Sequence, residues 1–265
     1  MPMVLADTHV VSLRDDVQRR HHIVEHFATI GLERYRFWPA VRHDDPRVAV
    51  AFRDGTVKRW PPCFRCGKPA CDCRNNVLIP PQVANWLSFV TLWRSLPDDP
   101  AAFHLICEDD VHFRDGALDR LEAFLCAYTP RSQRVLIRLA QSGEDPGPVV
   151  DQALERTQRV AMSNAAYIVN GAMAAFLARS FGRIEHTSDV WLHAVVAADP
   201  TIDAFTLEPL LATDLSYNRD FARFKSRIHP KGIDESDRAR QATHRMRATS
   251  DADYTELLAS WGVLP

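Results

Sequence analysis

The sequence predicts one α/β domain around a mostly parallel β-sheet, and two observations lead to this prediction. Short apolar runs rich in β-branched residues alternate with stretches in which apolar residues recur at helical spacing. The chain has 265 residues, 46% apolar and 25% charged, which suits a large globular domain and excludes a wholly disordered or fibrous chain. The formal net charge is -2, so we expect no nucleic-acid partner.

The chain is predicted to begin with a β-α-β unit. Residues 9–13 form a short apolar run with β-branched side chains, which is typical of a strand. Asp15 and Asp16 then open a predicted helix, which is expected to end at Gly31. Residues 35–40 are expected to form the second strand.

The remainder of the chain continues the same alternation. Strands are predicted at residues 103–107, 135–139, 165–169 and 204–208. Helices are predicted from residue 81, after a cap at Asp115, around residues 173–177, and at residues 187–198 and 250–262. Residues 1–228 are therefore expected to form the main domain, and residues 229–265 a C-terminal helical tail.

Several function classes lack their motifs in this sequence. It contains no G-x-G-x-x-G, no P-loop, no H-E-x-x-H and no G-x-S-x-G, which argues against a dinucleotide oxidoreductase, a P-loop kinase and an ordinary serine hydrolase. The most apolar stretch, residues 161–178, is interrupted by polar residues, and no apolar signal segment stands at the N-terminus. We therefore expect a cytoplasmic protein.

Three consecutive acidic residues, Glu108, Asp109 and Asp110, directly follow a predicted strand. Ligands of open α/β sheets bind beyond the carboxyl ends of the strands. Adjacent carboxylates repel one another unless a cation neutralises them, and their oxygens suit Mg²⁺ or Mn²⁺. Such a metal can bridge a pyrophosphate and stabilise a departing nucleoside diphosphate. The alternative interpretation is a solvated acidic turn.

Five segments of the chain, in order, resemble glycosyltransferase family 25, which includes lipooligosaccharide and collagen galactosyltransferases. The segments read HVVSLRDDVQRR, WLSFVTLWRSL, FHLICEDDVHF, NAAYIVNGAMAAFL and SDVWL, within residues 8–228. The resemblance implies a GT-A-like Rossmann-type fold and a metal-dependent, inverting transfer from a nucleotide sugar, commonly UDP-galactose. It also implies a glycan or glycolipid acceptor, such as a lipopolysaccharide or capsule precursor, and peripheral contact with a membrane.

The resemblance also implies roles for the acidic residues. Glu108, Asp109 and Asp110 match the family's variant of the DxD motif, which holds Mn²⁺ or Mg²⁺ and the donor. Asp110 is then the expected direct metal ligand, and Glu108 faces the ribose or shares the metal. Asp189 matches an acidic position that is suited to deprotonating the acceptor hydroxyl.

Residues after the first strand complete the implied donor site. Ser12, Leu13 and Arg14 would lie beside the nucleotide, and Arg19 would contact the phosphates. The family usually reads Gly-Cys-x-x-Ser-His in the helix before the acidic motif. Here Ser88 is kept and Phe89 replaces the histidine. This departure leaves open an alternative, a catalytically degenerate scaffold that binds a protein or nucleic acid.

Residues 42–80 are charged and broken by prolines, and they are predicted to form an irregular excursion. Within it, Cys63, Cys66, Cys71 and Cys73 place four thiols inside eleven residues. Four thiolates suit tetrahedral Zn²⁺ and leave no position for a substrate, so we expect a structural zinc. Alternatives are substitution of one thiol by His43, four free thiols, and a nucleic-acid-binding zinc knuckle.

A few further residues have an expected place. Trp86 and Trp93 lie on one helical stripe and are expected in the core. Cys107 is expected to be an inert buried thiol. His112 and His229 are candidates for a further ligand of the catalytic metal, and the basic residues within 219–227 are candidates for attracting a diphosphate.

Overall fold

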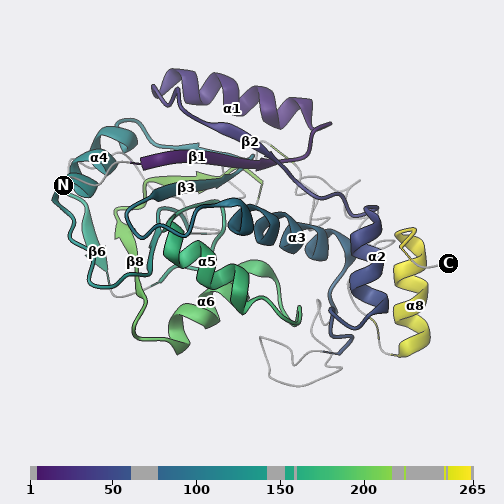
Figure 1. Ribbon diagram of the computed structural model, residues 1–265. Coiled ribbons are helices and arrows are strands. Elements are labelled where there is room, and N and C mark those ends of the chain that lie inside the picture. The colour runs from purple at the N-terminus through teal and green to yellow at the C-terminus, as the bar shows by residue number, and fades with distance from the viewer. Residues whose placement is uncertain are drawn as a thin grey trace.

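A seven-stranded β-sheet forms the centre of the computed structural model, which describes residues 5–60, 77–141, 153–157, 160–216, 224, 248 and 250–263 (Figure 1). The strands of this sheet are β1 (Leu5–Ser12), β2 (Arg36–Pro39), β3 (Phe103–Glu108), β5 (Val135–Arg138), β6 (Glu155–Thr157), β7 (Ala166–Asn170) and β8 (Asp203–Glu208). Their spatial order is β2-β1-β3-β7-β5-β8-β6. Two short strands, β4 (Val111–Phe113) and β9 (Ala212–Asp214), pair in a separate antiparallel sheet.

Five strands of the main sheet run in the same direction. β1 is parallel to β2 and β3, and β5 is parallel to β8. β7 lies between β3 and β5 and is antiparallel to both. The carboxyl ends of β1, β2, β3, β5 and β8 therefore lie at one edge of the sheet, together with the amino end of β7. We call this the carboxyl edge.

Helices cover both faces of the sheet (Figure 1). They are α1 (Val17–Thr29), α2 (Pro46–Arg53), α3 (Pro80–Ser95), α4 (Ala117–Ala127), α5 (Gly171–Ser180), α6 (Ser188–Ala198) and α8 (Asp251–Ser260). One hydrophobic cluster joins the sheet to α2, α3, α5, α6 and α8, and a second joins it to α1 and α4. The predicted class, an α/β fold with a mostly parallel sheet between helices, is confirmed.

Strand β3 shows how the two clusters form. Ile106 contributes to the α3 cluster, whereas Leu105 and Cys107 contribute to the α1 cluster. This alternation follows from the two-residue period of a strand. Trp86 and Trp93 are fully buried in the α3 cluster, as predicted. Cys107 is fully buried as well, and burial raises the pKa of its thiol, so the prediction of an inert cysteine is supported.

Part of the predicted irregular excursion is helical. Asp45 caps α2 by accepting a hydrogen bond from the backbone N–H of Arg47, and Pro46 occupies the first helical position. Val48 and Phe52 of this helix are buried in the α3 cluster. The prediction was wrong here because Pro46 begins a helix rather than interrupting one. Cys63, Cys66, Cys71, Cys73 and the expected zinc lie outside the described residues.

Other boundaries also differ from the prediction. α4 begins after Gly116, whose φ of 68° is left-handed, and Asp115 does not cap it. The three-residue strands β4, β6 and β9 were not predicted, because a run of three residues shows too little periodicity to indicate a strand. No helix among the described segments has the length and apolar character needed to cross a membrane.

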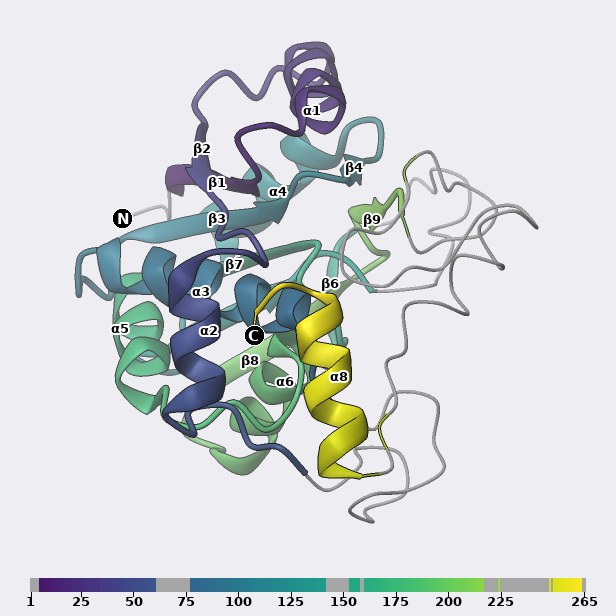
Figure 2. The same cartoon turned by 90° about the vertical axis from the view of Figure 1, so that its right-hand side faces the viewer.

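The C-terminal helix packs against the main body. Tyr254, Leu257 and Leu258 of α8 are buried in the α3 cluster. The Tyr254 hydroxyl donates a hydrogen bond to the carbonyl oxygen of Leu78 at 2.9 Å, and its ring meets Phe52 edge-on. Figure 2 shows α8 beside α2. The predicted tail helix therefore shares the core of the domain.

Gly171, the first residue of α5, lies directly against the backbone of the segment that precedes β3. Its amide nitrogen donates hydrogen bonds to Asp99 O at 3.1 Å and to Ala102 O at 2.9 Å. A Cβ at this position would lie 2.0 Å from Pro97 O. We expect Gly171→Ala to destabilise the fold by about 2 kcal/mol or more, because rigid backbone must move. Urea unfolding measures this, with Gly182→Ala as the control, since a Cβ there meets nothing within 4 Å. Equal stability of the two variants would contradict the expected close approach.

Candidate functional site

The acidic residues lie at the carboxyl edge, but they are largely withdrawn from solvent. Glu108 is the last residue of β3 and is half-buried, and Asp109 and Asp110 form the turn into β4. Asp109 is 7% exposed and Asp110 4%. The alternative of a solvated acidic turn is therefore wrong, since carboxylates are rarely buried without partners.

Arg19 is the partner that α1 supplies. Its Nη1 lies 2.8 Å from Asp109 Oδ1 and 3.3 Å from Asp110 Oδ2. Asp16 positions Arg19 by capping α1 through the backbone N–H of Arg19. Burial acts to lower the pKa of Arg19, but Asp110 and Asp109 raise it overall, so the guanidinium is firmly cationic.

Burial and mutual repulsion disfavour the ionised forms of these carboxyl groups, although Arg19 contacts two of them. The pKa of Glu108 is raised well above its usual value, first by burial and then by Asp110 and Asp214. Burial also raises the pKa of Asp109, although Arg19 opposes that rise. Asp110 Oδ1 is buried and has no hydrogen-bond partner among the described residues. The site thus has the electrostatic character of a cation site.

Glu108 faces the other helical layer, where a chain of polar side chains begins. Asn85 Nδ2 donates to Glu108 Oε1 at 3.3 Å, and Ser188 Oγ donates to Asn85 Oδ1 at 2.7 Å. Asn164 Nδ2 donates to Ser188 Oγ at 2.9 Å, and Arg138 Nη1 donates to Asn164 Oδ1 at 3.2 Å. We call these five residues the polar chain. It joins α3, α6, β5 and the segment before β7 at the carboxyl edge.

Sequence reasoning missed most of the polar chain. Arg138 ends the apolar strand β5, just as Glu108 ends β3, so the same signal was present for both. Asn85, Asn164 and Ser188 lie in helical or irregular segments where such residues are common, and no sequence pattern distinguishes them.

The residues expected around the nucleotide differ in their placement. Ser12 is buried at the end of β1, where its hydroxyl donates a hydrogen bond to Leu13 O at 3.2 Å and its side chain acts to lower the pKa of Asp109. Leu13 and the exposed Arg14 lie in the loop between β1 and α1. Ser12 and Arg19 therefore join the acidic residues directly.

Asp189, the expected base, lies in the first turn of α6 next to Ser188. It is half-buried, and its charge acts on Arg138. Asp189 thus lies beside the polar chain, in the helical layer that the side chain of Glu108 faces.

Ser88 and Phe89 are structural residues. Ser88 Oγ accepts a hydrogen bond from Val41 N at 2.8 Å and donates one to Ala84 O at 2.8 Å. Phe89 is fully buried and packs on the rings of Trp93 and Tyr167. The position where the resemblance expects a histidine therefore faces the hydrophobic core.

Three histidines follow the acidic residues along α1 and β4. His22 Nε2 lies 3.1 Å from Val111 O, and His26 Nε2 accepts a hydrogen bond from Phe113 N at 2.8 Å. The exposed ring of His112 stacks on that of His26 with centroids 4.2 Å apart. His22 and His26 thus brace β4.

The described residues contain no preformed metal site. Within the described ranges, no three His, Cys, Asp or Glu side chains converge closely enough to hold a metal ion. His43, the alternative zinc ligand, meets the ring of Trp261 edge-on. His229 and the basic residues of 219–227 lie outside the described residues.

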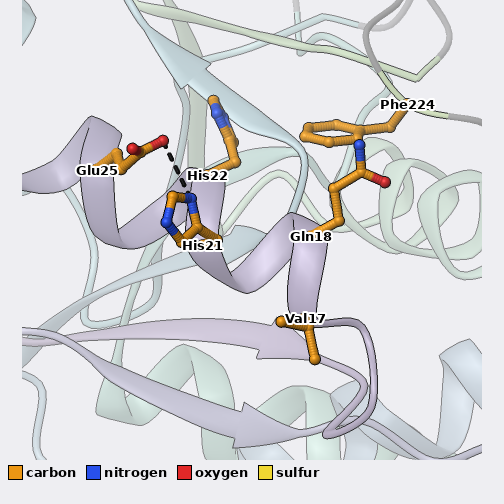
Figure 3. A pocket seen from close by; sticks show the side chains of 6 residues that line it. All are labelled: Val17, Gln18, His21, His22, Glu25 and Phe224. Atoms are coloured by element: carbon orange, nitrogen blue, oxygen red, sulfur yellow. Dashed lines mark ion pairs between the residues drawn. The ribbon is translucent and has the colours of Figure 1, made fainter.

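A pocket of about 380 Å³ adjoins α1 (Figure 3). Its lining consists of Val17, Gln18, His21, His22, Glu25 and Phe224. Arg19, one residue beyond Gln18, connects this pocket to the acidic residues, because its guanidinium lies 5.6 Å from the centre of the Phe224 ring. Phe224 is thus the neighbour that the pocket and Arg19 share.

No protein-family model matches the chain, and no curated protein matches it significantly.

Two buried histidines make stability depend on pH. Burial lowers the pKa of His26 to about 3 and that of His9 to about 4, from an ordinary value of 6.5. Both are neutral in the folded protein at pH 5, whereas the unfolded chain protonates them below pH 6.5. The stabilisation that comes from keeping these histidines neutral is thus fully present above pH 6.5. Below that pH, the free energy of unfolding falls by about 1.4 kcal/mol per pH unit for each histidine.

Between pH 7 and pH 5, we expect the free energy of unfolding of His26→Gln to fall by about 2 kcal/mol less than that of the wild type. Glutamine has no charge to gain, and its side chain retains a hydrogen-bond acceptor. Urea unfolding at the two pH values measures the difference, and His21→Gln, at an exposed position of α1, is the control. An unchanged pH dependence in His26→Gln would show that His26 is not held neutral.

Proposed function

We propose that this protein is a metal-dependent, inverting glycosyltransferase. It transfers a hexose, such as galactose, from a nucleotide sugar to a glycan acceptor such as a lipopolysaccharide or capsule precursor. One observation carries the proposal: three consecutive acidic residues, largely withdrawn from solvent and only two of them in contact with Arg19, lie at the carboxyl edge of a mostly parallel sheet. That edge is where α/β folds bind their ligands.

The residues present fit a divalent cation that arrives with the donor. Asp110 has a buried oxygen without a hydrogen-bond partner among the described residues, and Glu108 lies in the same field of negative charge. Mg²⁺ and Mn²⁺ usually bind through one or two carboxylates together with substrate phosphates, so a three-ligand protein cage is not required. Asp110 would hold the ion together with the phosphates of the donor, and the charge of the ion would stabilise the departing nucleoside diphosphate.

Two further features suit the donor. Arg19 is a buried cation beside Ser12 and is suited to binding phosphate oxygens. The pocket next to α1 has the ring of Phe224 and the amide of Gln18 in its lining, which suits a planar nucleobase (Figure 3).

Asp189 suits the role of the base. In an inverting transfer, the acceptor oxygen forms a bond to the anomeric carbon while the bond from that carbon to the diphosphate breaks. The proton of the acceptor hydroxyl passes to a carboxylate within hydrogen-bond reach. Asp189 is half-buried at the start of α6, on the same side of the sheet as Glu108.

Nucleotide release from UDP-, GDP- and CMP-sugars tests the proposal. We expect release from one donor class with Mn²⁺ or Mg²⁺ and none with a chelator. Asp110→Asn should reduce the rate at least about a hundredfold, because one ionised oxygen of the cation site is lost. Asp119→Asn, at an exposed position of α4, should retain the wild-type rate. If no donor were bound or cleaved, the transferase would be excluded, and the binding-module alternative would be favoured.

A second variant separates the base from the donor site. Asp189→Asn should bind the donor with the wild-type affinity and transfer the sugar about 10² to 10⁴ times more slowly, because the general base is lost. Calorimetric titration with the donor and a transfer assay measure the two quantities. Wild-type transfer by Asp189→Asn would show that another group takes the proton.

A further inference from the structure

Arg138 is a buried cation that the proposed function does not use. It ends β5 at the carboxyl edge and is fully buried. It forms no salt bridge with a carboxylate among the described residues, and the charges of Asp189 and Glu108 reach it only from a longer distance. Burial lowers the pKa of Arg138 to about 10, so the side chain is still charged at neutral pH. A buried charge without an opposite charge in contact is costly and calls for an explanation.

The guanidinium has one occupied and one unoccupied edge. Nη1 donates to the carbonyl oxygen of Ser163 and to Asn164 Oδ1. Nε and Nη2 are buried and have no hydrogen-bond partner in the described part of the chain. Their N–H bonds point in parallel from the same edge of the planar group, which is the arrangement that pairs with two oxygens of a carboxylate or phosphate.

The polar chain holds this edge in a defined orientation. A guanidinium can only donate hydrogen bonds, and each amide or hydroxyl group of the chain accepts one bond and donates the next, so the direction of the bonds from Arg138 to Glu108 is determined. Asn164 must present its oxygen to Arg138, and Asn85 must present its nitrogen to Glu108. The ring of Tyr167, 5.1 Å from the guanidinium carbon, adds a further contact. The free edge is therefore preorganised.

We propose that Nε and Nη2 of Arg138 bind an anionic pair of oxygens on the substrate. The site lies on the same face and edge of the sheet as Glu108, beside Asp189. If the proposed transferase function holds, on which this identification rests, the anion has two possible sources. It is either the diphosphate of the donor or the carboxylate of an acidic sugar in the acceptor.

Equilibrium binding to the full chain, without added divalent cations, tests the inference. Pyrophosphate represents the donor diphosphate and glucuronate the acidic sugar, with glucose as the uncharged comparison for glucuronate. Because Arg138 is enclosed, an anion reaches it only when surrounding groups move, so each sample is brought to equilibrium before calorimetry. Omitting the cation prevents the probes from binding through the metal site at Asp110.

We expect saturable binding of one charged probe and none of glucose. Arg138→Lys should weaken that binding about tenfold or more, because lysine keeps the charge but lacks the fork. Arg53→Lys, at an exposed position of α2, should bind as the wild type does. The probe that binds identifies the source of the anion. Absence of binding by the wild type, or equal binding by Arg138→Lys, would overturn the inference.

A measurement on the wild type covers the case in which Arg138→Lys does not fold. The arginine reagent phenylglyoxal should label Arg138 more slowly in the presence of the bound probe, whereas labelling of Arg53 should not change. Equal labelling of Arg138 with and without the probe would overturn the inference. None of these readouts requires sugar transfer. Sugar transfer without protection of Arg138 from labelling would refute the anion site alone. Protection of Arg138 without sugar transfer would refute the transferase function alone.

Discussion

Arg19 makes the contact on which the arrangement at the carboxyl edge depends, because it joins the first helix to the buried aspartates after β3. Arg19, His22 and His26 are spaced by three and four residues and therefore share one face of α1. Along that face, Arg19 binds Asp109 and Asp110, and the two histidines bond to the backbone of β4. A single helical stripe thus orders both the acidic turn and the strand that follows it. Without the arginine, the buried aspartates would lack their main source of positive charge, at a cost of several kcal/mol.

The acidic residues do not act as one group. Asp109 and Asp110 meet Arg19 on the α1 side, whereas Glu108 meets Asn85 on the α3 side. This division explains why the three carboxylates do not form a cage for a metal in the described structure. It also gives the carboxyl edge two regions of different chemistry. One has acidic residues and Arg19 beside a pocket, and the other has the polar chain ending at a buried guanidinium.

The polar chain joins the buried cation of Arg138 to the carboxyl group of Glu108. Arg138 and Glu108 are separated by three neutral side chains that transmit a single direction of hydrogen bonding. Hydrogen bonds in such a chain polarise one another, and the low dielectric of the interior strengthens the effect. The orientation of Glu108 therefore depends on β5, α6 and α3 together. Ser188 is the junction, and it is adjacent to Asp189, the proposed base.

Local patterns in the sequence predicted the alternation of strands and helices, the buried tryptophan stripe of α3, and the acidic residues at the end of β3. These features follow from periodicity and from the boundary between an apolar run and charged residues, which are local properties of the chain. Long-range packing, in contrast, set the reversed direction of β7, the helix α2 within the predicted excursion, and the burial of the acidic turn. It also brought Asn85, Arg138, Asn164 and Ser188 together. These residues are far apart in the sequence, and hydrogen bonds between them depend on strand order and helix packing, which leave no periodic signal in the chain.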